Sequence, residues 1–84
     1  MLNNYILLKP AQKYIERLPP DEQLRIIRAL DLLITDKNRL DIKPLKGRIE
    51  SRLRVGNYRI LFVEDTAKKL YVITTIGSRG DVYK

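Results

Sequence analysis

The sequence predicts an α+β fold in the order β-α-α-β-β-β, with a helical hairpin packed on one face of an antiparallel sheet. Two segments of the first half carry apolar residues at helical spacing, and a Pro-Pro pair separates them. The second half instead shows apolar-polar alternation and runs of β-branched residues. A chain of 84 residues has room for one domain, so we assign residues 1–84 to a single unit.

The first half supplies one expected strand and two expected helices. Residues 5–8 form a short apolar run that we expect to be a strand. A helix is expected to begin near Pro10 and to end before Pro19, because the residue before a proline is disfavoured in the helical conformation. The second helix is expected from Pro20 to about residues 36–38. Its predicted buried stripe comprises Leu24, Ile27, Leu30, Leu33 and Ile34, with Ile26 alongside.

The second half is expected to contain an irregular link over residues 40–50, a β-hairpin over residues 51–63 and a last strand over residues 70–76. Gly56-Asn57 suits a two-residue turn of type II′, and type I′ is also possible. Either turn pairs Arg54 with Arg59 and divides the side chains between two faces. The first face is apolar and carries Leu53, Val55, Tyr58, Ile60 and Phe62. The second carries Arg52, Arg54 and Arg59, followed by Leu61 and Val63.

The arginine-bearing face indicates a function. Like charges directly opposite each other destabilise a strand pair, so Arg54 opposite Arg59 suggests a compensating polyanion or acidic partner. The alternative is that the arginines simply extend into water. Residues 1–42 hold seven basic and six acidic groups (+1), and residues 43–84 hold ten and four (+6). Positive charge gathered on the sheet half is expected of a nucleic-acid-binding domain.

The absence of cysteine and histidine narrows the possible chemistry. It excludes disulfides and thiolate metal sites, and it removes the commonest metal ligand and general base. We therefore expect neither a metal nor a cofactor. The N-terminal residues 1–10 lack the apolar stretch of a signal peptide, and no segment approaches the length of a membrane span. We therefore expect a cytoplasmic protein.

The order of elements and three motifs resemble the RelE/ParE superfamily of bacterial and archaeal toxins, most closely its RelE branch. These motifs are LKG at residues 45–47, RLRVGNYRILF in the hairpin and the closing IGSRGDVYK. The resemblance implies the toxin of a type II toxin–antitoxin system. It also implies a metal-independent endoribonuclease that cleaves mRNA in the ribosomal A site, by attack of a ribose 2′-hydroxyl on the adjacent phosphodiester. The implied partners are the ribosome, mRNA and a cognate acidic antitoxin like RelB, which orders on binding.

The same resemblance assigns roles to individual residues. It implies that the catalytic residues are Arg52, Arg59, Arg79 and Tyr83. It implies RNA contacts by Lys46, Arg48 and Arg54. Clustered guanidinium groups suit this reaction, because they stabilise the extra negative charge that develops on the phosphate in the transition state. Glu50 stands where the family often has a lysine, and it is a possible general base.

Two other functions remain open at this point. The first is a ParE-like inhibitor of DNA gyrase, because the fold is shared and does not fix the function. The hairpin arginines and Tyr83 favour the ribonuclease over this alternative. The second is a catalytically inactive module that only binds an antitoxin, because Glu50 and Ser78 depart from the family pattern. Tyr83 could stack on an RNA base, take part in proton transfer or close the edge of the core.

Overall fold

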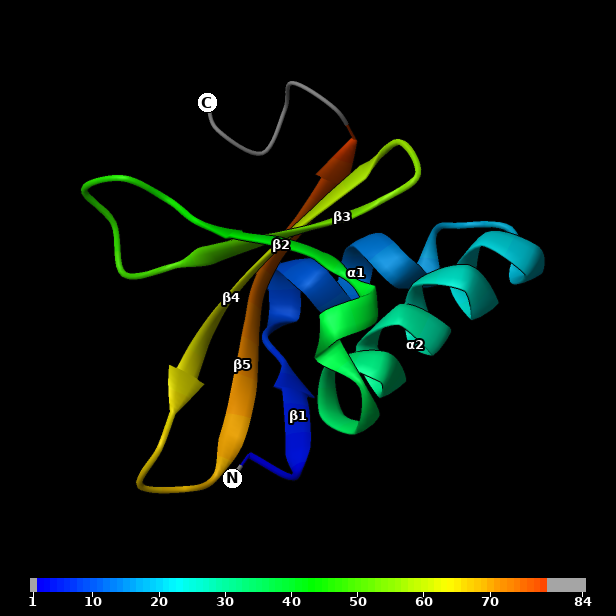
Figure 1. Cartoon of the computed structure of the whole chain (residues 1–84). Coiled ribbons are helices and arrows are strands. Elements are labelled where there is room, and N and C mark those ends of the chain that lie inside the picture. Colours follow the sequence, from blue (N-terminus) through cyan, green and yellow to red (C-terminus); the bar gives the residue numbers. More distant parts are fainter. Residues whose placement is uncertain (1, 79–84) are drawn as a thin grey trace.

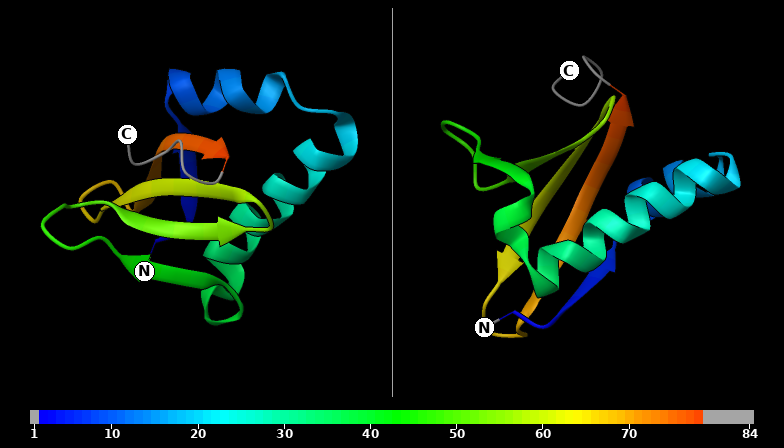
Figure 2. Two further views of the ribbon diagram at one scale, coloured as in Figure 1. Left: turned by 90° about the horizontal axis from the view of Figure 1, so that it is seen from above. Right: turned by 45° about the vertical axis from the view of Figure 1, so that its right-hand side comes forward.

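The computed structural model describes residues 2–78, and its five strands form one sheet in the order β1-β5-β4-β3-β2. The elements are β1 (Asn4–Leu7), α1 (Lys9–Glu16), α2 (Pro20–Thr35), the 3₁₀ helix η1 (Lys37–Arg39), β2 (Asp41–Pro44), β3 (Ser51–Val55), β4 (Tyr58–Asp65) and β5 (Leu70–Ser78). Both α-helices lie on the same face of the sheet, as Figure 1 and Figure 2 show. The predicted α+β class and the one-sided placement of the helices are confirmed.

The sheet departs from the prediction in two details. β1 pairs with β5 in parallel, so the sheet is mixed rather than purely antiparallel. The segment expected to be an irregular link contains a further strand, β2, which pairs with β3. This strand forms because Ile42 stands opposite Leu53 and packs against the core. Pro44 is tolerated because β2 is an edge strand, where a missing backbone N–H leaves no ladder bond unmade.

Prolines define the ends of both α-helices. α1 begins at Lys9 with Pro10 in its first turn, and it ends at Glu16, shortly before Pro19. α2 begins at Pro20, and the carbonyl group of Pro19 accepts hydrogen bonds from two N–H groups of the first turn. A proline fits these positions because the first turn of a helix leaves its N–H groups without intrahelical acceptors. None of the described helices is long and apolar enough to cross a membrane.

The buried stripe of α2 is rotated relative to the predicted one. The side chains of Ile26, Ala29, Leu30 and Leu33 are between 0% and 6% exposed. Leu24 was predicted to belong to the stripe, but it is 48% exposed. Two residues correspond to about 200° of rotation around a helix, so Leu24 and Ile26 cannot both face the sheet. Ile26 is the one that does so, because it shares a face with Leu30 and Leu33.

The sheet side of the core uses the predicted apolar face of the hairpin. Leu53, Ile60 and Phe62 are buried in the core, and Val55 and Tyr58 pack against it. β5 adds Tyr71, Ile73 and Ile76 to the same cluster. The rings of Phe62 and Tyr71 meet edge to face, with 5.6 Å between their centroids. This geometry favours aromatic pairs, because the positive edge of one ring meets the negative face of the other.

The β3–β4 hairpin has the predicted register. Val55 pairs with Tyr58, and Arg54 pairs with Arg59. Gly56 has a φ angle of +55°, whereas Asn57 is not among the residues with positive φ. A positive φ at the first turn position alone corresponds to type II′, so the type I′ alternative is excluded.

Candidate nucleic-acid interface

The candidate site is the face of the sheet opposite the helices, which we call the outer face. In the described part of the chain no helix covers β3 and β4 on this side (Figure 2). The strand register places Arg52 and Arg54 of β3 and Arg59 of β4 on the outer face. Arg54 lies directly opposite Arg59, so the structure contains the like-charge pair that the sequence predicts. The fold therefore brings three of the predicted site residues together.

Arg52 is the most deeply placed of these arginines, and it is only 8% exposed. In the sheet it stands between Lys43 of β2 and Leu61 of β4. Its Nη2 atom lies 3.0 Å from Oδ1 of Asp41 and donates a hydrogen bond to it. Its Nε atom is buried without a hydrogen-bond partner among residues 2–78. The position of Arg52 is therefore set by an acidic neighbour that sequence reasoning did not single out.

Arg54 and Arg59 are more accessible to a ligand. The Arg54 side chain is 45% exposed, and its Nε atom lies 3.7 Å from Oδ2 of Asp41. Arg59 stands beside Gly77 of β5, which has no side chain to cover it. Among residues 2–78, no carboxylate lies within ion-pair distance of Arg59. Arg59 is therefore the arginine of the outer face that is best placed to meet an anion.

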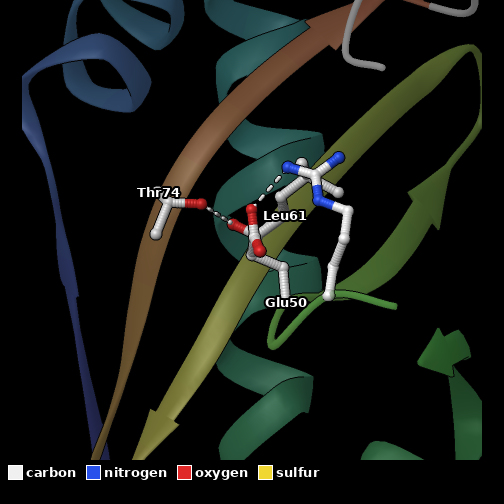
Figure 3. Close-up of polar contacts among 4 residues, drawn as sticks. Glu50, Leu61 and Thr74 are labelled. Atoms are coloured by element: carbon white, nitrogen blue, oxygen red, sulfur yellow. Dashed lines mark hydrogen bonds and ion pairs between the residues drawn. The ribbon is translucent and has the colours of Figure 1, made fainter. Parts of the chain in front are cut away.

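The connection between β2 and β3 holds three further predicted site residues, Lys46, Arg48 and Glu50. The N–H group of Leu45 donates to the carbonyl oxygen of Glu50 over 3.1 Å and closes this loop. The Glu50 carboxylate accepts a hydrogen bond from Nη2 of Arg48, with 2.6 Å between the atoms (Figure 3). Lys46 is exposed in the same loop. The guanidinium of Arg48 is thus already engaged, whereas Lys46 remains open to solvent.

A β-bulge underlies the middle of the outer face. The register between β4 and β5 shifts between Leu61 and Phe62, so Thr74 is the extra residue. Its hydroxyl group donates a hydrogen bond to the carbonyl oxygen of Leu61 over 3.2 Å (Figure 3). Leu61 is 1% exposed although its side chain belongs to the outer face. In Figure 3 the side chain of Glu50 projects in front of β4 where Leu61 lies.

Two predicted catalytic residues, Arg79 and Tyr83, lie outside the described residues, and their roles stay predictions. Sequence reasoning missed Asp41 and Lys43, which the register of β2 places on the outer face. The signal that could have found them is the short polar-apolar alternation over residues 41–43. Among residues 2–78 no group of three or more metal-ligating side chains occurs.

Comparisons with known proteins identify the family. A protein of Methanocaldococcus jannaschii that bears the provisional name toxin RelE1 is 31% identical over 85 residues, covering 96% of this chain and 94% of the relative. No family model matches the sequence. At this identity and coverage, the chain belongs to the RelE family of toxins.

Solved structures show the same fold. A chain in the crystal structure of the archaeal RelE-RelB complex from Pyrococcus horikoshii matches with a TM-score of 0.77 and 23% identity, over 98% of this chain and 100% of that one. A chain of the toxin-antitoxin complex RelBE2 from Mycobacterium tuberculosis also gives a TM-score of 0.77 at 23% identity, over 94% of this chain and 100% of that one. The isolated RelE toxin of E. coli matches with a TM-score of 0.64 at 16% identity, over 96% of this chain and 90% of that one.

Proposed function

We propose that this chain is the toxin of a type II toxin–antitoxin pair and that it cleaves mRNA in the A site of the ribosome. The observation that carries the proposal is the outer face, where Arg54 and Arg59 stand opposite each other and no helix of the described chain covers them. RNA phosphates would offset the repulsion between these two charges. The ribosomal target places the action of the toxin in the cytoplasm.

The reaction is an attack of a ribose 2′-hydroxyl on the adjacent phosphodiester, which leaves a 2′,3′-cyclic phosphate. Negative charge builds up on the phosphate oxygens in the transition state, and guanidinium groups fixed beforehand stabilise it. Arg59 is assigned this role because it lies within the sheet and meets no carboxylate among residues 2–78. Arg54 and Lys46 contact the RNA backbone. Arg79 and Tyr83 are assigned to the same site on the family resemblance.

Cleavage of mRNA on programmed ribosomes, mapped by primer extension, tests the proposal. We expect discrete cuts in the A-site codon with the wild type. We expect Arg59→Gln to lower the rate by about 10²–10³-fold, as the loss of one transition-state donor does in other enzymes. Arg28→Gln is the matched control, because Arg28 is exposed on α2 and its loss changes the net charge equally. This variant is expected to cleave like the wild type.

Two outcomes would contradict the ribonuclease, and a third would contradict the role assigned to Arg59. A folded wild type that arrests growth without cutting mRNA would indicate the gyrase inhibitor instead, and a supercoiling assay would test it. A folded wild type that does neither would indicate a module that only binds an antitoxin. Equal losses of activity in Arg59→Gln and Arg28→Gln would show that net charge matters and that the position of Arg59 does not.

The proposed partner is an acidic antitoxin that is partly disordered until it binds. The net charge of +7 favours an acidic partner. Three large apolar residues, Ile6 of β1, Leu8 before α1 and Leu24 of α2, are between 41% and 48% exposed and offer contact area to its apolar residues. If the antitoxin carboxylates meet the outer face, affinity is expected to fall as salt is added. An affinity that salt does not change would mean that the antitoxin binds through apolar contacts alone.

A further inference from the structure

Asp41 of β2 is a carboxylate set among the cations of the outer face. Its Oδ1 atom lies 3.0 Å from Nη2 of Arg52, and its Oδ2 atom lies 3.7 Å from Nε of Arg54. Each oxygen therefore points to a different guanidinium group. Within residues 41–44, 51–55 and 58–61, Asp41 is the acidic side chain on this face, which it shares with Lys43, Arg52, Arg54, Arg59 and Leu61.

The contact between Asp41 and Arg52 is the shorter and less exposed of the two. The Arg52 side chain is 10% exposed, and its contact with Asp41 has the length of an ordinary N–H···O hydrogen bond. Because Nε of Arg52 has no partner among residues 2–78, Asp41 is the main compensation for this buried charge. Removal of the Asp41 carboxylate from this contact would leave the guanidinium group of Arg52 buried without a counter-charge, which is unfavourable. We therefore expect Asp41 to remain on Arg52 when a ligand binds.

The contact between Asp41 and Arg54 is weak by comparison. At 3.7 Å it is longer than a hydrogen bond, and both side chains are nearly half exposed, at 45% and 48%. Exposed ion pairs of this kind contribute little, because water and salt screen them. A phosphate that approaches Arg54 can therefore replace Asp41 as the counter-ion of its guanidinium group.

We propose that Asp41 is an internal counter-anion that competes with RNA phosphate for Arg54 while it holds Arg52 in place. This inference rests on the proposed RNA-cleaving function and assigns a regulation to that site. Arg52 is then a positioning residue for the arginine face. A phosphate that binds Arg54 must displace the Asp41 carboxylate from it and then lie close to this negative charge. RNA that is not held by the ribosome therefore binds weakly.

The test compares Asp41→Asn with Glu64→Gln in binding to a single-stranded RNA oligonucleotide whose 2′-O-methyl groups prevent cleavage. Asparagine keeps the shape of Asp41 and an oxygen that can accept from Arg52. Glu64 is the matched control because its side chain is 47% exposed and pairs with Lys37 at 3.9 Å, away from the arginines. Fluorescence anisotropy over a salt series gives the affinity and its salt dependence.

We expect Asp41→Asn to bind this RNA about three- to tenfold more tightly than Glu64→Gln at low salt. One additional phosphate contact should also steepen the slope of log affinity against log salt by about 0.7. In an Arg54→Gln background the gain should vanish. Binding equal to or weaker than that of Glu64→Gln would overturn the proposal, and so would a gain that persists without Arg54.

A second comparison covers the case in which Asp41→Asn does not fold, as judged by circular dichroism. Arg54→Gln is then expected to weaken RNA binding less than Arg59→Gln, because Asp41 already neutralises part of the Arg54 charge. An equal or larger loss in Arg54→Gln would overturn the proposal. If Asp41→Asn folds but fails to bind RNA while wild type still cleaves on ribosomes, only this inference fails. If nothing binds and nothing is cleaved, the proposed function fails with it.

Discussion

The phenolic hydroxyl group of Tyr58, at the start of β4, donates a hydrogen bond to the carboxylate of Glu22 in the first turn of α2, with 3.2 Å between the oxygen atoms. The ring of Tyr58 also meets the ring of Tyr14 of α1 edge to face, at 6.2 Å between centroids. Both helices are thereby joined to the hairpin at the residue next to Arg59. The helical side of the fold thus helps to fix the arginine face on the opposite side.

This arrangement predicts a loss of stability at high pH. Burial raises the pKa of Tyr58 above the ordinary value of 10.0, and the hydrogen bond to the Glu22 carboxylate raises this pKa further. Because this pKa is higher in the folded state than in the unfolded state, the protonated hydroxyl group stabilises the fold. This contribution to stability is fully present below about pH 10, and it is lost as pH rises through the folded pKa. We expect the unfolding temperature to fall more steeply above about pH 10 in the wild type than in Tyr58→Phe.

A second variant for this measurement is Tyr5→Phe. Burial also raises the pKa of Tyr5, and the nearby charge of Asp31 raises it further, so Tyr5 contributes in the same direction. The two single variants should each flatten the pH dependence in part, and the double variant should flatten it more. Identical slopes in wild type and Tyr58→Phe would show that the contact with Glu22 does not couple to protonation.

Gly56 is predicted to be needed for the hairpin turn. Its φ angle of +55° is strained for any residue with a side chain, and a Cβ there would lie 2.8 Å from Nη2 of Arg25. The Arg25 side chain is 55% exposed and can move aside, so the backbone strain dominates. We expect Gly56→Ala to lower the free energy of unfolding by about 1–2 kcal/mol in urea titrations.

Gly47→Ala is the matched comparison for this prediction. Gly47 has a φ angle of +76°, and a Cβ there would meet no atom within 4 Å. Its substitution therefore measures backbone strain alone. A much larger loss in Gly56→Ala than in Gly47→Ala would show that Arg25 cannot move and that its packing on the turn contributes to stability.

Leu53 anchors the apolar side of the hairpin. It is 0% exposed and packs in the core cluster with residues of α2 and β5. We expect Leu53→Ala to reduce the free energy of unfolding by about 2–5 kcal/mol, because it removes buried area and leaves a cavity. Ile49, 87% exposed in the β2–β3 loop, is the control. Ile49→Ala should change stability by less than about 0.5 kcal/mol, and comparable losses in both would mean that the core does not centre on Leu53.

The hairpin was predictable from sequence because two local signals agree. The Gly56-Asn57 turn sets the register, and the apolar alternation around it assigns the same faces. β2 was not predictable in this way, because it is four residues long and ends at Pro44. It forms a strand because Ile42 pairs with Leu53 and packs against the core, and these contacts join segments that are distant in sequence. α2 carried two overlapping apolar stripes, and only packing against the sheet selected the one with Ile26.

The candidate site was predictable as a face but not as a set of contacts. Alternation alone put Arg52, Arg54 and Arg59 on the same side of the sheet. The burial of Arg52 and its bond to Asp41 depend on the register of β2, so they could not follow from the hairpin alone. The pairing of Arg48 with Glu50 depends likewise on how the β2–β3 loop closes on itself.

That pairing predicts that Glu50 is not the general base. Its carboxylate already accepts a hydrogen bond from Arg48 over 2.6 Å, and its side chain is 20% exposed. We expect Glu50→Gln to lower the rate of mRNA cleavage on programmed ribosomes by less than about threefold, whereas loss of a general base costs about 10²–10⁴-fold. Arg48→Gln should have an equally small effect, because both substitutions remove the same ion pair. A hundredfold loss in Glu50→Gln alone, with unchanged stability and an altered pH–rate profile, would instead make Glu50 the base.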